Sequence, residues 1–319
     1  MDYFLAAFAI LSVLCVNANR SRKARKDTPS LQRALIIALF FFLPRVDVSL
    51  LEIGKGEKLR KPTSVASEIK IVSYNIRWRS GEELKLLTKL LMEDPEIGGA
   101  AILGLQEVDR RKKRSGNTNT AKIIADQLGM YYAWAAPPTA KPEDEEETGV
   151  AIMSVYRLSD VRRIVLPHEG PNSRRRVALG ATVEIHNRHW RVYSAHAETR
   201  ISVGKKMEQF KAVLQDLAQY PADMPAIIMG DFNTWQPDAD GKTAKLFLDA
   251  GLKTPFGPQA TFRRRILLVP IELKLDWVWL RGLEAGTFGI DRKIEISDHW
   301  PLWTNVKIPH DGTKPTKVN

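Results

Sequence analysis

Residues 227–235 read IIMGDFNTW and place three apolar residues directly before a glycine, an aspartate and an asparagine. The apolar run predicts a short buried strand. Asp231 and Asn233 are two positions apart, and residues spaced by two in an extended segment point to the same side. The stretch therefore predicts a carboxylate and an amide that face one site at the edge of a sheet.

The segments around this stretch alternate between strand and helix patterns. Helices are predicted over 82–92, 117–128, 202–217 and 243–250, and apolar positions 203, 207, 210, 214 and 217 mark the third as amphipathic. Strands are predicted over 69–74, 100–105, 131–135, 150–154, 177–185, 190–195, 275–280, 286–290 and 302–307. Strands outnumber helices, and hairpins mix with strand–helix–strand units. This pattern favours a layered α/β domain with mixed sheets.

The net charge of +11 over 319 residues is unevenly distributed. Residues 1–70 hold 12 Lys/Arg against 6 Asp/Glu, whereas the remainder holds 36 against 31. The globular part is thus only mildly basic, which gives nucleic acid little support as a partner and fits small phosphorylated substrates equally well. The single cysteine, Cys15, excludes an internal disulfide and a cysteine-based zinc site.

The N-terminal part carries two apolar runs, residues 4–18 and 34–44, separated by a basic segment. We interpret residues 1–48 as a targeting or membrane-anchor segment, either a secretory signal or two short membrane segments contacting lipid through residues 4–44. The alternative is a pair of core helices in a small domain. The first interpretation predicts an exported or membrane-anchored protein with its catalytic domain on the non-cytoplasmic side. A linker is expected over 49–68, the globular domain over 69–308 and a tail over 309–319.

Polar residues close or interrupt several of the predicted strands. Oxygen donors dominate this set and cysteine is absent, which suits a hard cation such as Mg²⁺, with Mn²⁺ as the alternative. Two histidines add the capacity for proton transfer, so the set fits the attack of water on a phosphate ester. Its members are Asn75, Glu107, His196, Asp231, Asn233, Asp276, Asp298 and His299.

Five motifs carry a family resemblance: SYNI at 73–76, LQEV at 105–108, GDFN at 230–233, LDWV at 275–278 and SDHWP at 297–301. In this order they resemble the endonuclease/exonuclease/phosphatase superfamily over residues 69–308. That group includes deoxyribonucleases, AP endonucleases, sphingomyelinases and inositol-polyphosphate phosphatases. The resemblance implies a four-layer α/β sandwich of two packed mixed β-sheets flanked by helices. It also implies a metal-dependent hydrolase that cleaves a phosphodiester or phosphomonoester.

The same resemblance assigns roles to the metal and water ligands. Glu107 would be the main Mg²⁺ ligand with Asn75 beside it, and Asp298 would help to hold the metal or the histidine-bearing loop. Asp231 would orient or deprotonate the attacking water, and Asn233 would bind a non-bridging phosphate oxygen. Some relatives have an acidic residue where this chain has Arg77, so the number of metal ions, one or two, stays open.

Further roles fall on the two histidines and one arginine. His299 would be the general base or a charge stabiliser on the phosphate, with Asp276 fixing its tautomer through the other ring nitrogen. His196 would contact the phosphate or assist the leaving group. Arg176, in the run of arginines at 174–176, would reach the substrate phosphate, with a solvated cluster at the entry of a strand as the alternative.

Three functional classes remain open at this point: a phosphodiesterase or phosphatase, a nuclease acting on DNA or RNA, and a catalytically silent binding module of the same fold. Loss of a metal or histidine position would favour the silent module, and no such position is lost in this sequence. The substrate and the oligomeric state are not determined by the sequence.

Overall fold

The computed structural model describes residues 50–62, 67–138, 147–267 and 269–308. The predicted targeting or anchor segment at 1–48 and the predicted tail at 309–319 lie outside these ranges, so both remain predictions. Within the described ranges, no helix is both long enough and apolar enough to cross a membrane.

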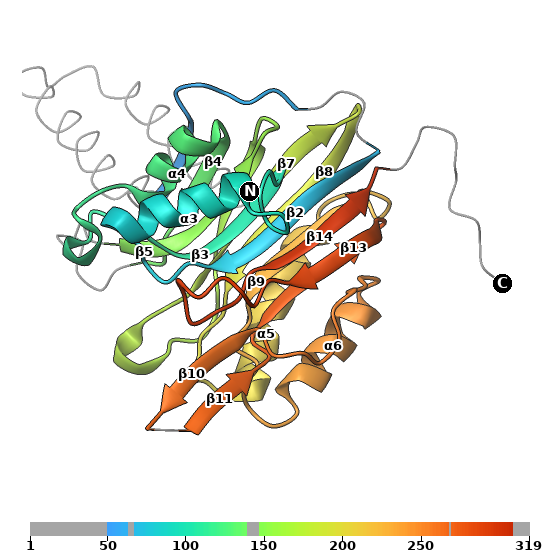
Figure 1. The fold of residues 1–319 in the computed structure, drawn as a ribbon. Helices are drawn as coiled ribbons and strands as arrows, with labels where there is room; N and C mark the ends of the chain where they lie inside the picture. Colours follow the sequence, from blue (N-terminus) through green and yellow to red (C-terminus); the bar gives the residue numbers. More distant parts are fainter. Residues whose placement is uncertain (1–49, 63–66, 139–146, 268, 309–319) are drawn as a thin grey trace, which may run out of the picture. The chain divides into compact units, whose positions relative to one another are not determined.

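Two mixed β-sheets form the centre of the described domain (Figure 1). The larger has the strand order β1-β4-β5-β3-β2-β14-β13 and the smaller the order β12-β9-β8-β7-β6. β2 runs parallel to β3 and β8 parallel to β9, and the other neighbours are antiparallel. The larger sheet consists of β1 (Leu51–Lys55), β2 (Glu68–Asn75), β3 (Ile102–Arg110), β4 (Tyr131–Ala135), β5 (Glu147–Ser154), β13 (Glu284–Ile290) and β14 (Leu302–Lys307). The smaller consists of β6 (Ser159–Val165), β7 (Val177–Ile185), β8 (Arg188–His196), β9 (Ala226–Asp231) and β12 (Asp276–Arg281).

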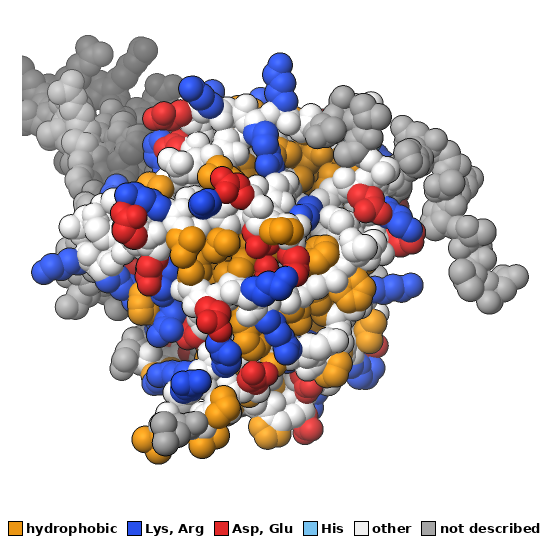
Figure 2. All heavy atoms as spheres, in the orientation of Figure 1, with side chains coloured by type: hydrophobic (Ala, Val, Ile, Leu, Met, Phe, Trp, Pro, Cys, Tyr) orange, Lys and Arg blue, Asp and Glu red, His pale blue; other side chains and the backbone are white. Residues whose placement is uncertain are grey.

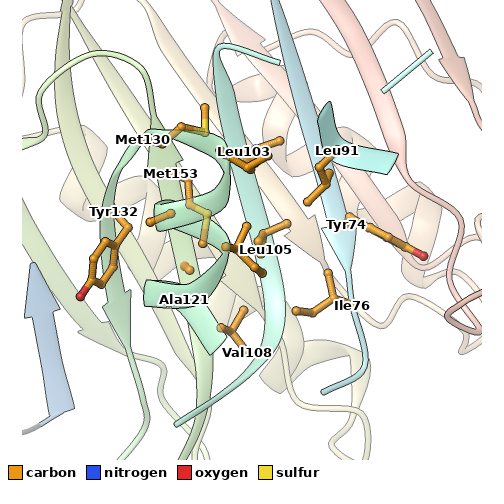
Figure 3. Close-up of a cluster of buried hydrophobic side chains, with 14 of the residues drawn as sticks. Tyr74, Ile76, Leu91, Leu103, Leu105, Val108, Ala121, Met130, Tyr132 and Met153 are labelled. Atoms are coloured by element: carbon orange, nitrogen blue, oxygen red, sulfur yellow. The ribbon is translucent and has the colours of Figure 1, made fainter. Parts of the chain in front are cut away.

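Helices cover the outer face of each sheet. The larger sheet packs against α3 (Gly81–Glu93) and α4 (Thr120–Leu128), and the smaller against α5 (Val203–Leu217) and α6 (Ala239–Asp249). Figure 3 shows the first of these interfaces, where Leu91 and Ala121 of the helices meet Leu103 and Leu105 of β3. Two short 3₁₀ turns, η2 (Lys113–Ser115) and η3 (Pro171–Ser173), complete the helices. The four-layer sandwich implied by the resemblance is confirmed.

The described domain has three hydrophobic cores, one between the two sheets and one between each sheet and its helices. The stretch at 227–235 contributes to two of them. Ile227 and Met229 of β9 lie in the core between the two sheets, whereas Ile228 lies in the core that the smaller sheet forms with α5 and α6. This division follows the alternation of side chains along a strand. Because β9 is buried on both faces, its end is held rigidly, and Asp231 is fixed with it.

Several local predictions differ from the structure. Leu51–Lys55, within the predicted linker, is the edge strand β1, which pairs with β4. It was not predicted from the sequence because the strand has only five residues and lies in a charged segment. β6 and the hairpin of β10 (Phe262–Ile266) and β11 (Val269–Leu273) were not predicted, because runs of arginine break the apolar alternation. On α5 the buried face is shifted from the predicted one and includes Lys206, Gln209 and Val213, while Met207 and Leu214 are only half-buried.

Gly230 is required where β9 passes closest to β8. Its φ is 145°, and a Cβ at this position would lie 1.9 Å from the carbonyl oxygen of Ala195. We expect Gly230→Ala to lower the free energy of unfolding by about 3 kcal/mol or more, since neither backbone can move aside.

Urea unfolding followed by circular dichroism measures this change. Gly204→Ala on α5 is the matched control, because nothing lies within 4 Å of its added methyl group. The control is expected to be neutral or to stabilise by about 0.5–1 kcal/mol. Equal stabilities of the two variants would contradict the close approach of the strands.

Candidate active site

Both sheets end in polar residues at the same edge of the sandwich. Asn75 ends β2 and pairs with Gln106, next to Glu107, whereas Asp231 ends β9 between His196 of β8 and Asp276 of β12. A hydrogen bond of 3.0 Å from Nδ2 of Asn75 to Oδ2 of Asp231 joins the two sheets at this edge. The side chains predicted to share one site are therefore brought together.

Glu107 owes its position to a bulge in β3. The register with β5 shifts between Gln106 and Val108, and Glu107 adopts a φ of 56°. Within the described residues its half-buried carboxylate makes one hydrogen bond, accepted at 3.4 Å from Nδ2 of Asn75. Most of the acceptor capacity of this carboxylate is thus directed at the site without a protein partner.

Asp298 lies at the rim of the site and is held by Arg77. Nη1 of Arg77 lies 3.1 Å from Oδ2 of Asp298, and the backbone N–H of Arg77 donates to Oδ1 of Asn75 at 3.1 Å. The residue that departs from the family pattern therefore supplies a positive charge beside the carboxylate predicted to help with the metal.

Asp231 begins a turn that also places Asn233. The backbone N–H of Asn233 donates to Oδ1 of Asp231 at 3.0 Å, and Asn233 adopts a φ of 53°, which asparagine tolerates better than most residues. Its side-chain amide donates to the carbonyl of Ala197 at 3.0 Å. The buried Lys206 of α5 donates to the backbone carbonyl of Asn233 and so stabilises the turn.

His299 lies between two carboxylates. Its Nδ1 is 2.8 Å from Oδ2 of Asp276, and its Nε2 is 3.7 Å from Oδ2 of Asp231. Burial alone would lower the pKa of His299, but the charges of Asp276 and Asp231 outweigh it and raise the pKa to about 10. Burial also raises the pKa of Asp231, with Asp276 adding to the effect. The two carboxylates therefore favour the charged imidazolium form of His299.

His196 is neutral, in contrast to His299. Burial, and then the neighbouring charge of Arg176, lower its pKa well below the usual value. Nη1 of Arg176 donates to Nδ1 of His196 at 3.3 Å, so the proton lies on Nε2, which is 3.5 Å from Oδ2 of Asp231. Nε of Arg176 donates to the buried Glu198 at 3.0 Å. Arg176 is thus part of the wall of the site and does not form a solvated cluster.

A family model describes this arrangement of strands and motifs. The model of the endonuclease/exonuclease/phosphatase family matches residues 72–299, which is most of the chain. The chain belongs to this family. A sequence comparison with curated proteins gives no match.

Solved structures of the family share the fold at low sequence identity. The catalytic domain of human Nocturnin with bound sulfate is 18% identical with a TM-score of 0.56, over 78% of this chain and 99% of that one. D. rerio TDP2 with a single-strand DNA product is 14% identical with a TM-score of 0.60, over 76% and 100%. A mannosyl-6-phosphatase from Bacteroides thetaiotaomicron is 15% identical with a TM-score of 0.56, over 75% and 100%.

The donor set of the site fits the divalent cation that the family implies. Glu107 offers a carboxylate with free acceptor capacity. The atom of Asn75 beside it is the amide nitrogen Nδ2, while the oxygen Oδ1, the atom that could bind a cation, accepts from the backbone N–H of Arg77. A second group, Asp231, Asp276 and His299, has ligand atoms within 4.8 Å of one another. This trio fits a cation less well, because both ring nitrogens of His299 face carboxylates and its proton would have to leave first. Glu107 therefore fits a cation better than this trio does, and the metal-ligand roles of Glu107 and Asn75 stay predictions.

Two polar residues of the site were missed in the sequence. Lys206 supports the turn at Asn233, and Glu198 holds Arg176. The signal for Lys206 was its spacing of four and seven residues from Phe210 and Val213, which places a lysine on the buried face of α5. Glu198 follows β8 by two residues, and only its partner, 22 positions away, gives it a role.

Asp276 controls the charge of His299, which predicts a change in pH dependence. Asp276→Asn removes the largest interaction that raises the pKa of His299, so the imidazole should lose its proton about 1–3 pH units lower. The decline of kcat on the alkaline side should move to lower pH accordingly. NMR titration of the histidine Cε1 protons measures the pKa directly. An unchanged pKa of His299 in this variant would contradict the assignment.

Proposed function

We propose that the protein is a metal-dependent phosphoric ester hydrolase that cleaves its substrate by in-line attack of an activated water. One observation carries this proposal. Nδ2 of Asn75 lies 3.0 Å from Asp231, 3.4 Å from Glu107 and 3.5 Å from Nε2 of His299. A metal ligand, a carboxylate for the water and a cationic imidazole thus converge on one point, as hydrolysis of a phosphate ester requires.

Glu107 and Asn75 would hold the cation, with Mg²⁺ as the first candidate and Mn²⁺ as the second. A divalent ion bound there supplies charge neutralisation for the phosphate oxygens. Asp298 would act mainly on the loop that carries His299, because its carboxylate already pairs with Arg77. The carboxylate and amide oxygens of this set are the ligands that Mg²⁺ prefers.

The carboxylates around His299 favour one of its two predicted roles. An imidazolium cannot accept a proton, so His299 would stabilise the negative charge of the phosphate rather than act as the general base. Asp231 would then orient the water and take its proton, a task that its raised pKa suits. His196 would donate from Nε2 toward the phosphate or the leaving group, and Asn233 would bind a non-bridging oxygen.

The net charge of the globular part says more about the substrate class than the fold does. One structural neighbour is named as a phosphatase and another holds a DNA product, so the fold accommodates both chemistries. The small positive excess of the globular part gives a nuclease no specific support. We favour a phosphodiester or phosphomonoester outside nucleic acid, acted on by an exported or membrane-anchored protein.

A panel of substrates tests the proposal. The full chain with Mg²⁺ would be incubated with bis(p-nitrophenyl) phosphate, p-nitrophenyl phosphate, plasmid DNA and sphingomyelin. We expect turnover of at least one non-nucleic-acid ester and its loss on chelation with EDTA. Cleavage of plasmid DNA alone would support the nuclease. Absence of turnover with both Mg²⁺ and Mn²⁺ would support the silent binding module.

A further inference from the structure

The β10–β11 hairpin stands apart from both large sheets. Its strands, Phe262–Ile266 and Val269–Leu273, form a two-stranded sheet of their own, which an isolated bridge between Phe262 and His299 joins to the rest of the domain. In Figure 1 this arm projects from the body of the domain below the two sheets. A two-stranded ribbon buries little of its own surface, so an arm of this kind is available for contact with another body.

The tip of the arm is apolar and exposed. The side chain of Leu267 is 93% exposed and that of Val269 is 63% exposed. Leu267 also adopts a φ of 56°, a left-handed conformation that glycine and asparagine adopt more readily than leucine. A leucine here is unfavourable both for the backbone and for solvation, which folding alone does not explain.

The strands behind the tip carry positive charge. Arg264 and Arg265 are exposed and make no side-chain hydrogen bond or ion pair with any residue that the structure describes. Arg263 pairs with Glu295, and Glu272 is the single acidic residue of the hairpin. Figure 2 shows hydrophobic side chains at the end of the arm and Lys and Arg side chains above them.

We propose that this hairpin docks the protein on a membrane surface that contains anionic phospholipid. Leu267 and Val269 enter the boundary between head groups and acyl chains, while Arg264 and Arg265 bind the head-group phosphates. An arm that binds single-stranded nucleic acid would instead need aromatic side chains for base stacking, and the described tip residues are aliphatic. Aliphatic side chains at the tip with Arg264 and Arg265 behind them therefore favour lipid over nucleic acid as the partner.

The base of the arm is continuous with the active site. The ring of Phe262 packs 4.9 Å from that of His299, and the backbone N–H of Arg263 donates to the carbonyl of Asp298 at 2.8 Å. The N–H of Trp300 donates to the carbonyl of Thr261 at 2.7 Å. Docking of the tip would therefore bring the site to the level of phosphate esters at the membrane surface. The binding itself does not depend on the proposed hydrolase activity.

A dye at the tip tests the proposal independently of the N-terminal segment. The full chain with Cys15→Ser and Leu267→Cys would be labelled with an environment-sensitive NBD fluorophore. We expect a several-fold rise in emission with phosphatidylcholine/phosphatidylglycerol vesicles and a smaller rise with pure phosphatidylcholine. The matched control is the same label at Leu248→Cys on α6, where the side chain is 55% exposed, and no rise is expected there.

No change at position 267 with anionic vesicles would overturn the proposal, as would a rise with single-stranded DNA in the absence of lipid. Charge is tested separately by vesicle titration of the label at position 267 in the Arg264→Gln/Arg265→Gln background, because flotation of the full chain would also report lipid contact through residues 4–44. The affinity of this variant for anionic vesicles relative to the parent chain should fall by about 30-fold at low salt, the effect of two surface arginines. Leu267→Asp should weaken binding and leave turnover of a soluble ester unchanged. Leu267→Asp would be followed with the label at Val269→Cys, and titration curves like those of the parent chain for both variants would contradict docking through the hairpin.

Discussion

His299→Ala should lower kcat about 10²–10⁴-fold, the usual scale for a residue that handles charge or protons in the transition state. The reason is the position of the imidazolium, held at 2.8 Å by Asp276 and facing Asp231 at 3.7 Å. Alanine removes the positive charge at the point where a phosphate oxygen would gather negative charge. Steady-state kinetics with the ester that the substrate panel identifies would measure the loss.

The control for this variant is His189→Ala, since His189 is exposed on β8 far from the edge of the strands that forms the site. It should turn over like the wild type. Thermal unfolding should show that both variants remain folded. A loss of less than about threefold in His299→Ala would remove His299 from the mechanism.

Glu107→Gln should remove metal-dependent turnover, by about 10²–10⁴-fold at low Mg²⁺, since a bound metal contributes several kcal/mol to such reactions. The substitution keeps the shape of the side chain and removes its negative charge. Because the carboxylate has one long hydrogen bond and no ion pair within the described residues, stability should change little. Titration calorimetry with Mg²⁺ measures the loss of binding separately from the loss of turnover.

Glu184→Gln, at an exposed position of β7, is the matched control and should bind Mg²⁺ as the wild type does. Wild-type turnover by Glu107→Gln, with the same Mg²⁺ requirement, would contradict the assignment of Glu107 as the main metal ligand. Partial recovery at high Mg²⁺ would be consistent with a weakened site that still forms.

The sequence predicted most of the strands and their polar ends because both depend on local pattern, whereas the packing of two sheets followed from the family resemblance. β9 is a continuous apolar run, and its end at Asp231 follows from Gly230 and the polar residues behind it. The order of the motifs implied, through the family resemblance, that Asn75, Glu107 and His299 share one site. These residues are recognisable because each follows or interrupts a buried strand.

Features that depend on a distant partner could not be predicted. The contacts that hold Arg176 come from Glu198 and His196, which lie 22 and 20 positions away, and its contact with a substrate phosphate stays a prediction. The pairing of Arg77 with Asp298 spans most of the domain and gives a reason for the departure from the family pattern. The hairpin escaped prediction because three consecutive arginines obscure the alternation of a strand.

The central claim is that water attacks phosphorus at this site with the help of a metal. Hydrolysis of the active substrate in H₂¹⁸O with Mg²⁺, analysed by mass spectrometry of the products, tests it most directly. We predict one ¹⁸O atom in the phosphate product per turnover, with no turnover after chelation by EDTA and its return on adding Mg²⁺. Label in the alcohol product, or turnover that EDTA leaves unchanged, would contradict the account.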